Sequence, residues 1–525
     1  MLIRILIILI VISVRTTFAQ KDETAVEYAA TIRAGDLKER LEIIASDEFE
    51  GRETGHPGQK KAAVYIRDRF KEFGFAPVEQ LNGYYQPFKL QLTYPDTVDL
   101  IVGKDSLKFL RDMYYFPGFG DIRIETEDLI YLGHGISSSN YDDYADRTVA
   151  SRVLMISAGE PKDRKGRSLI ADDGIASDWT SDWTRKINLA MYGKGVKALL
   201  IIDDNFRSSV VQHGRHIKRP DIKIGDEPMD VTGMMPVIYI TSKMADRILK
   251  AGGSRKTHRQ LEKAIGRKGN PIHVDLNIPV TLDVRKNREE LASENVLAYL
   301  EGTDRKDELV IITAHYDHLG KKGDDIYNGA DDDGSGTSTL LEIAEAFSLA
   351  QKAGHGPRRS MLFMTVSGEE KGLLGSEFYT DHPVFPLSST VVDLNVDMIG
   401  RIDKHHAPDS NYVYLIGSDK LSTELHALSE RINATYAGIK LDYTYNDEND
   451  PNRFYYRSDH YNFAKNNIPV IFYFTGVHKD YHQPTDTVDK IMFQKTEKIA
   501  RLIFHTAWEI ANREKRLSVD RKMEE

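Results

Sequence analysis

The chain has 525 residues, a formal net charge of −10 and no cysteine. This length exceeds what one hydrophobic core usually serves, so we expect two or three domains. The acidic balance, without a Lys/Arg-rich run, gives no support for nucleic-acid binding. The absence of cysteine excludes disulfides and thiolate metal sites, so any metal must be bound by His and carboxylate side chains.

The first 19 residues have the pattern of a secretory signal peptide. An apolar run from Ile5 to about Val14 follows a short basic start, and the small residue Ala19 precedes Gln20. The run is shorter than the roughly 20 residues that a bilayer span needs. We therefore expect cleavage near Ala19, no stable membrane insertion afterwards, and a secreted or periplasmic protein. Loss of Arg4 and Arg15 would change the charge to −10 − 2 = −12.

Residues 20–94 are predicted to be the first part of the main domain. Apolar residues at 62, 63, 66, 70 and 73 indicate a helix that ends at Gly74. From 95 to 285 the pattern changes to strands with glycine turns, at 128–135, 151–157, 196–203 and 235–240, with short helices near 183–192 and after 240. We find no His and carboxylate cluster with ligand spacing in this region. It is therefore interpreted as an inserted, β-rich α/β accessory domain.

Residues 286–515 are predicted to form the main domain, followed by a charged tail at 516–525. Strands are expected at 295–301, 308–316, 360–367, 390–397, 411–417 and 469–475, and helices near 336–353, 372–381, 421–435 and 493–511. This alternation predicts a three-layer αβα domain with a mainly parallel sheet. In such sheets, sites gather at the carboxyl ends of the strands.

Metal-ligating side chains follow the predicted strands. The candidates are His315, Asp317, Asp332, Glu369, Glu370, Asp397 and His482. Three consecutive carboxylates at 331–333, flanked by glycines, would repel one another unless a cation lies among them. Imidazoles combined with carboxylates suit one or two Zn²⁺ ions better than Ca²⁺ or an iron–sulfur cluster.

The ordered motifs resemble one known family of peptidases. They are His315-x-Asp317, Gly329-Ala-Asp-Asp-Asp-Gly-Ser-Gly336, Glu369-Glu370, Asp397-Met and Tyr481-His482 followed by Asp-Thr487. Together they resemble the two-zinc aminopeptidases of metallopeptidase family twenty-eight, over residues 30–90 and 290–510. The region between resembles the protease-associated domain that such proteins often carry.

The resemblance implies a role for each site residue. Two Zn²⁺ ions would be bound, one by His315, Asp332 and Asp397 and the other by Asp332, Glu370 and His482. Asp332 would bridge them, Glu369 would be the general base and Asp317 would orient His315. The resemblance also implies a cis Asp332–Asp333 peptide bond. Tyr455, three residues before Ser458-Asp-His460, is a candidate donor to the oxyanion, or it simply packs among neighbouring tyrosines.

The expected function is exopeptidase hydrolysis of N-terminal residues from peptides by zinc-activated water. Alternatives with the same fold are a carboxypeptidase, which needs cationic groups such as Arg453 or Arg457, a glutaminyl cyclase, and a non-catalytic receptor-like binding protein. Residues 446–450 are interpreted as a solvated loop, and His318, His405 and His406 as surface residues. The sequence indicates neither oligomeric state nor side-chain preference.

Overall fold

The computed structural model describes residues 21–116, 121–171, 174–218, 221–225, 235–407 and 409–522. The predicted signal peptide, residues 1–19, and the last three residues of the predicted tail lie outside this part of the chain. The chain divides into two compact units. One, here called the discontinuous unit, joins the residues up to Lys89 to those from Leu291 onward, and the other, the inserted unit, is Leu90–Glu290.

The helices have the following bounds: α1 Glu23–Ala29, α2 Ala34–Ile44, α3 Pro57–Phe73, α4 Asp178–Ser181, α5 Trp183–Asn188, α6 Phe206–Lys218, α7 Ser242–Ala251, α8 His258–Lys268, α9 Gly336–Lys352, α10 Leu374–Asp381, α11 Thr423–Ile432, α12 His460–Ala464 and α13 Phe493–Asn512. The strands have the following bounds: β1 Tyr85–Val102, β2 Asp105–Leu107, β3 Met113–Tyr114, β4 Ile122–Thr126, β5 Leu129–Leu132, β6 Val153–Ser157, β7 Ala198–Asp203, β8 Asp221–Ile224, β9 Val237–Thr241, β10 His273–Asp275, β11 Val280–Leu300, β12 Arg305–His315, β13 Gly320–Lys322, β14 Asp325–Tyr327, β15 Arg359–Val366, β16 Thr390–Val396, β17 Tyr412–Ile416, β18 Lys440–Asp442 and β19 Val470–Phe474.

The sheet of the discontinuous unit is mainly parallel. Its strand order is β18-β17-β19-β16-β12-β15-β11. β12 pairs in parallel with both β15 and β16, and β16 pairs in parallel with β19. β17 pairs antiparallel with β19 and parallel with β18, and β11 pairs antiparallel with β15. The central strands therefore share one direction, and their carboxyl ends meet at one edge.

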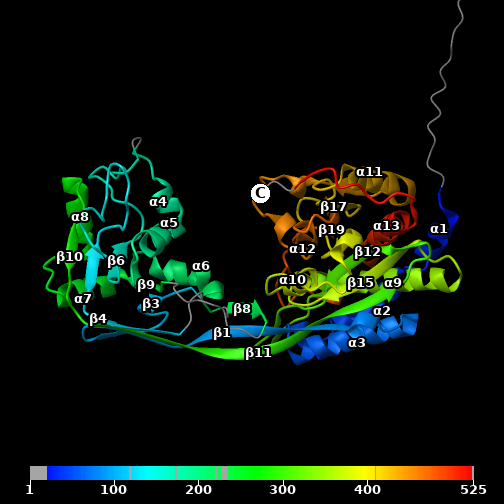
Figure 1. The fold of residues 1–525 in the computed structure, drawn as a ribbon, viewed down its shortest axis with the longest axis horizontal. Coiled ribbons are helices and arrows are strands. Elements are labelled where there is room, and N and C mark those ends of the chain that lie inside the picture. The colour runs from blue at the N-terminus through cyan, green and yellow to red at the C-terminus, as the bar shows by residue number, and fades with distance from the viewer. Residues whose placement is uncertain are drawn as a thin grey trace, which may run out of the picture. The chain divides into compact units, whose positions relative to one another are not determined.

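Both faces of this sheet are buried. Successive residues of a strand point to opposite faces of a sheet, and successive residues of the central strands belong to two different apolar cores. In β12, Val310 and Ile312 belong to one apolar core, and Leu309 and Ile311 belong to another. Helices α1, α2, α3, α9, α11 and α13 contribute to the first core, and α10 and α12 to the second. α9 and α13 lie beside β12 and β15 in Figure 1. The predicted three-layer αβα domain is confirmed.

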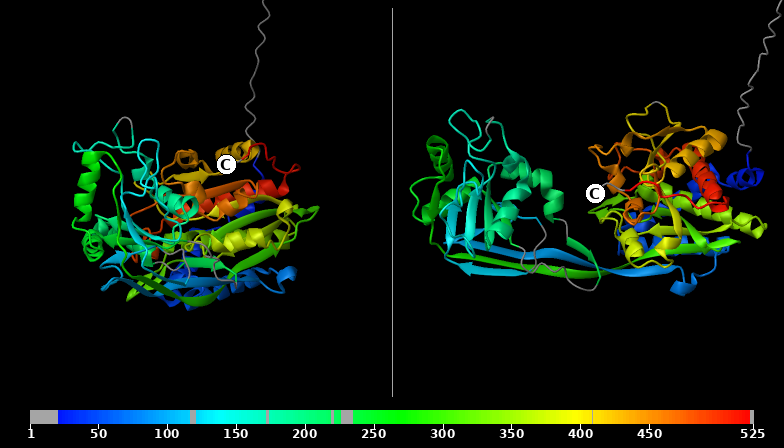
Figure 2. Two further views of the ribbon diagram at one scale, coloured as in Figure 1. Left: turned by 60° about the vertical axis from the view of Figure 1, so that its left-hand side comes forward. Right: turned by 45° about the horizontal axis from the view of Figure 1, so that its top comes forward.

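The inserted unit has a parallel core of its own. β5, β6, β7 and β9 pair in parallel in that order, and β10 and β3 close the edges antiparallel. The chain alternates strands with helices, and successive β6 residues such as Leu154 and Met155 belong to separate apolar cores. α7 and α8 lie on one side of β6 and α4 and α5 on the other (Figures 1 and 2). This unit is thus an α/β layered fold, with the predicted strands present.

Two long strands exceed the predicted elements. β11 begins at Val280, whereas the prediction began at 295, and β1 was not predicted at all. In the early half of β11, buried side chains alternate with exposed or half-buried ones up to Val284, so it lacks the continuous apolar run by which the other strands were recognised. Among the described residues, no helix combines the length and apolar character needed to cross a bilayer.

Candidate metal centre

Three parallel strands deliver polar side chains to one edge of the sheet. β12 ends at His315, Asp397 directly follows β16, and Glu369 comes three residues after β15. The Nε2 atom of His315 lies 3.3 Å from Asp332 Oδ1, 3.7 Å from Asp397 Oδ1 and 3.9 Å from Glu369 Oε2. We call His315, Asp332, Glu369 and Asp397 cluster 1.

A second group of side chains gathers around the other oxygen of Asp332. His482 Nε2 lies 3.1 Å from Asp332 Oδ2 and 3.2 Å from Glu370 Oε2. His318 Nδ1 lies 2.8 Å from Glu370 Oε1 and 3.8 Å from Asp332 Oδ2. We call Asp332, Glu370, His482 and His318 cluster 2. The two oxygens of Asp332 therefore face different histidines, one in each cluster.

His318 was predicted to be a surface residue, and this prediction is wrong. Its side chain is fully buried, because the ring packs against Gly329, where a Cβ atom would come within 2.6 Å of it. The signal was its position in the same strand-end segment as His315. The prediction for His406 is also wrong: it is buried, stacks on Tyr412 and contacts Asp403. His405 is exposed, as predicted.

The three consecutive aspartates have different tasks. Only Asp332 joins the clusters. Asp331 Oδ1 accepts from the Gly400 N–H at 2.6 Å, and Asp333 Oδ1 accepts from the N–H groups of Gly336 and Met398 at 2.8 and 3.1 Å. A Cβ atom at Gly336 would lie 2.4 Å from both Asp333 carboxylate oxygens, which explains the glycine there. The predicted cis Asp332–Asp333 bond is confirmed.

Asp317 reaches His315 through its main chain. The Nδ1 atom of His315 is 3.1 Å from the carbonyl oxygen of Asp317 and 3.8 Å from its carboxylate. That carboxylate instead accepts from Thr54 Oγ1 at 2.7 Å and from the Glu369 N–H at 3.2 Å. If Nδ1 donates to the carbonyl, the Nε2 lone pair is directed into cluster 1.

Two tyrosines differ in their relation to the clusters. Tyr481 lines a pocket together with Asp332, Glu369 and Asp397, and its ring stacks on His482. Tyr455 is buried and lines a different pocket, together with residues 445–450. Of the predicted solvated loop 446–450, residues 447–449 are exposed, whereas Asp450 at its end is buried. The structure thus places Tyr481 beside the clusters, whereas Tyr455 lines the other pocket.

Residues 295–507 are a continuous segment of the discontinuous unit. This segment matches the family model described as Peptidase family M28. The discontinuous unit that contains it is called the M28 unit from here on.

Relatives and one solved structure are similar to this chain. A probable leucine aminopeptidase of Trichophyton verrucosum is 30% identical over 215 residues, 39% of this chain and 55% of that protein. Aminopeptidase YwaD of Bacillus subtilis is 26% identical over 226 residues, 40% of this chain and 42% of that protein. The chain spans about half the length of these curated relatives. The solved aminopeptidase from Aneurinibacillus sp. strain AM-1 shares its fold, with 20% identity, a TM-score of 0.55, and coverage of 95% of this chain and 100% of that one.

The charged side chains of the two clusters shift one another's pKa values. Burial would lower the pKa of His482, but hydrogen bonds to Asp332 and Glu370 raise it to about 9. Burial would raise the pKa of Asp332, yet His318, His315 and His482 hold it well below its usual value. Burial raises the pKa of Glu369 well above its usual value. Positive charge among these carboxylates is therefore strongly favoured.

The donor set of the M28 unit fits metal ions. The structure contains groups of His and carboxylate side chains whose donor atoms lie within 4.8 Å of one another, including His315 with Glu369 and Asp397, and His318 with Asp332 and Glu370. The buried Nε2 of His315 makes no hydrogen bond within the described part of the chain, although three carboxylates surround it. Nitrogen and oxygen donors in this arrangement suit zinc-type cations.

A third such group lies in the inserted unit, where none was expected. Asp204, His258 and Glu262 bring donor atoms within 4.8 Å of one another. The expectation failed because 54 residues separate Asp204 from His258, although the four-residue spacing of His258 and Glu262 on one helix was a readable signal.

Proposed function

We propose that the protein is a two-zinc aminopeptidase. One observation carries the proposal: the two carboxylate oxygens of Asp332 lie 3.3 Å from His315 and 3.1 Å from His482. A carboxylate that faces two separate donor groups is suited to bridge two cations about 3.5–4 Å apart, which would otherwise repel. The match of residues 295–507 to the model of Peptidase family M28 supports a peptide substrate.

The ligand assignment rests on the two clusters. In this proposal, His315, Asp332 and Asp397 bind one Zn²⁺, and Asp332, Glu370 and His482 bind the other. His318 is a further donor at the second position, at 2.8 Å from Glu370. Ser458 Oγ donates to Asp397 Oδ2 at 2.7 Å, which leaves the Oδ1 atom facing His315 available for a metal.

Glu369 is the general base in this proposal. Bound zinc would supply acidification of a water molecule and polarisation of the scissile carbonyl. Glu369 reaches cluster 1 from the end of β15, and its main-chain N–H is fixed by Asp317. Its carboxylate would take a proton from that water and pass it to the leaving amine.

The oxyanion of the tetrahedral intermediate needs a hydrogen-bond donor. The sequence pointed to Tyr455, but we favour Tyr481, because Tyr481 shares a pocket with Glu369 and Asp332. Burial, together with the nearby carboxylates, raises the pKa of the Tyr481 phenol, so it stays protonated and able to donate. Comparison of Tyr481→Phe with Tyr455→Phe tests the choice, and a larger loss of kcat in Tyr455→Phe would reverse it.

The pocket beside the clusters indicates a preference for apolar N-terminal residues. Phe454, Phe472, Phe474 and Val477 line it, together with Met398. Aromatic and aliphatic walls favour substrates with apolar side chains, because binding removes apolar surface from water. We therefore expect leucyl or phenylalanyl substrates to be cleaved with higher kcat/KM than aspartyl or lysyl ones.

The decisive experiment combines metal content with substrate blocking. Elemental analysis of the purified protein would be paired with turnover of free and N-acetylated peptides, before and after chelation. At least two zinc ions per chain, together with chelator-sensitive cleavage that acetylation blocks, would establish the aminopeptidase. Cleavage indifferent to acetylation would favour a carboxypeptidase, for which Arg457 beside the pocket is the available cation.

Two further outcomes separate the remaining alternatives. Cyclisation of N-terminal glutamine without peptide cleavage would identify a glutaminyl cyclase. A protein without zinc and without turnover would favour a receptor-like binding role, although that role gives no reason to retain clustered buried carboxylates.

Export and the inserted unit complete the proposal. We propose that residues 1–19 are removed during secretion, which N-terminal sequencing of the mature protein from the native host would test. We also propose that the inserted unit is a protease-associated domain that limits substrate size. Its removal should alter selectivity between long and short peptides, and unchanged selectivity would contradict this role.

A further inference from the structure

The inserted unit contains a pocket at the carboxyl ends of its own parallel strands. Its volume is about 880 Å³. His134 follows β5, Glu160 follows β6 and Asp204 follows β7, and all three line it. Glu262 of α8 lines the pocket as well. This is the position where ligands bind in open parallel sheets, at the ends of adjacent strands.

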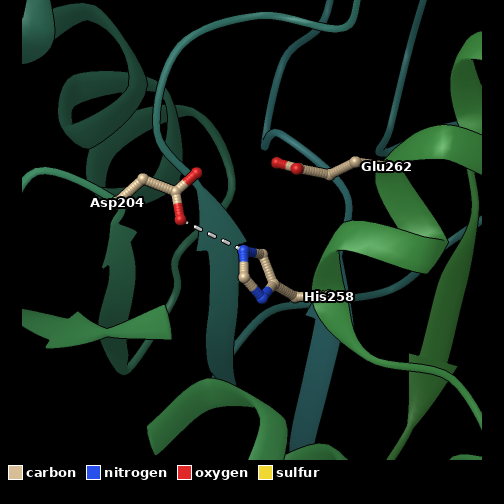
Figure 3. A group of neighbouring side chains, drawn as sticks. All are labelled: Asp204, His258 and Glu262. Atoms are coloured by element: carbon tan, nitrogen blue, oxygen red, sulfur yellow. Dashed lines mark ion pairs between the residues drawn. The ribbon is translucent and has the colours of Figure 1, made fainter. Parts of the chain in front are cut away.

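Three potential ligand atoms converge beside this pocket. His258 and Glu262 lie four residues apart on α8, so they share one helix face. Asp204 approaches from the loop after β7, and the three side chains point toward one another in Figure 3. Asp204 Oδ1 lies 3.3 Å from His258 Nε2, close to the separation of about 3.3 Å between two ligands of one tetrahedral zinc ion.

The histidine is held as a metal ligand would be held. His258 is only 1% exposed, and its Nδ1 atom is 3.2 Å from Asp246 Oδ1, which also accepts from the His258 main-chain N–H at 2.8 Å. If Nδ1 donates to Asp246, the Nε2 lone pair points toward Asp204 and Glu262. Nε2 makes no hydrogen bond to any residue in the described ranges, so a buried, oriented nitrogen is left facing two carboxylates.

We propose that Asp204, His258 and Glu262 bind one divalent transition-metal ion of the zinc type, separate from the ions proposed for the M28 unit. One imidazole and two carboxylates form a mixed nitrogen and oxygen donor set, which suits Zn²⁺ and disfavours Ca²⁺. The fourth position would be open to water or to a ligand in the pocket. Asp246 is a positioning residue that fixes the histidine ring.

One competing arrangement is an ion pair without a metal. A protonated His258 would contact Asp204 and Asp246 simultaneously. The Arg259 side chain also approaches Asp204 Oδ1, at 3.8 Å, and would compete with a cation there. The two arrangements differ in their response to Arg259→Gln. If the three side chains bind a metal ion, removal of the competing guanidinium should strengthen metal binding. If they form only an ion pair, the substitution should not change metal binding.

The test is zinc binding by the full-length protein, measured as zinc content after equilibrium dialysis against buffered free Zn²⁺. We expect His258→Gln and Glu262→Gln each to contain one zinc ion fewer per chain than the wild type. Because Glu262 is less buried than His258, Glu262→Gln keeps the test valid if His258→Gln folds poorly. Asp246→Asn should weaken binding at this site about 10- to 100-fold, the usual effect of losing the partner of a metal-bound histidine.

The matched control is a substitution of an exposed aspartate in the inserted unit. Asp178→Asn changes an aspartate of the same unit whose side chain is 81% exposed, and its zinc content should equal that of the wild type. Equal zinc content in the wild type, His258→Gln and Glu262→Gln would overturn the proposal. This difference is independent of the M28 clusters, so it decides the question even if those clusters bind no zinc.

Discussion

The two units bring His and carboxylate side chains together from different kinds of element. In the M28 unit, ligand candidates follow β12, β15 and β16, and main-chain N–H groups and Thr54 hold the adjacent carboxylates. In the inserted unit, one loop and one helix supply all three, and Asp204 retains a side-chain exposure of 45%. The contrast teaches that ligand candidates can be gathered at the ends of parallel strands or between a helix face and a loop, and that hydrogen bonds to neighbouring groups support the strand-end set.

The largest expected effect is that of Asp332→Asn. Loss of the shared charge should remove zinc from both clusters of the M28 unit and lower kcat/KM by about 10⁴-fold, because metal activation of water is lost. Elemental analysis and kinetics measure both. Asp324→Asn, at an exposed aspartate eight residues earlier, is the matched control. Full zinc occupancy in Asp332→Asn would remove the bridge from the proposal.

Glu369→Gln separates chemistry from metal binding. The amide cannot accept the proton, so kcat should fall by about 10²–10⁴-fold. Zinc content should remain that of the wild type, because Glu369 is not a proposed ligand. Stopped assays with a leucyl substrate and elemental analysis provide the two measurements. Normal turnover would exclude Glu369 as the general base.

Arg52 tests the support behind cluster 1. Its fully buried guanidinium donates to the carbonyl oxygens of Tyr316, Ile44, Asn328 and Gly329, at 2.7–2.9 Å. Arg52→Met should destabilise the M28 unit by about 3–5 kcal/mol, because buried carbonyl groups lose their donor. Urea unfolding followed by circular dichroism measures this. Arg69→Met, at a more exposed arginine, should change stability far less, and an equal loss would contradict the explanation.

Lys495 of α13 should give the M28 unit a specific pH dependence. Burial lowers the pKa of Lys495 to about 7, although its Nζ donates to the carbonyl oxygens of Ser410 and Tyr412. The unfolded chain holds this proton up to its ordinary pKa of about 10.4, so the free energy of unfolding should rise from pH 7 to that value. Lys495→Met should reduce this slope by about 1.4 kcal/mol per pH unit, the amount for one proton. An unchanged slope between pH 7 and 10 would contradict the assignment.

The smallest effect is expected from the inserted unit. Glu262→Gln should leave kcat and KM for a short leucyl substrate within about twofold of the wild type, because Glu262 belongs to neither cluster of the M28 unit and surface substitutions usually change stability by only about 0.5 kcal/mol. Steady-state kinetics on a dipeptide measures this. A large loss of turnover would show that the two units are functionally coupled.

The sequence predicted site residues that lie at the ends of buried strands, and it missed residues that are positioned by loops. His315 and Asp397 were identifiable because each comes at the end of a buried apolar strand. His318 was missed because its burial depends on the approach of Gly329, which local patterning does not contain. The group at Asp204 was missed because the fold, not the spacing, brings the β7 loop to α8. Similarly, the sequence pointed to Tyr455 and not to Tyr481, because only the structure shows that Tyr481 lines a pocket with Asp332 and Glu369.

The shared position of Asp332 has a thermodynamic consequence. Under the proposed function, one carboxylate contributes to the affinity of both metal positions, so each ion must change the affinity for the other by the same factor. The first ion would partly neutralise the Asp332 carboxylate, which lowers the affinity for the second ion. It would also fix the orientation of the Asp332 side chain, which raises that affinity. A zinc titration should therefore show two linked binding events, in which the affinity at each position depends on whether the other is occupied.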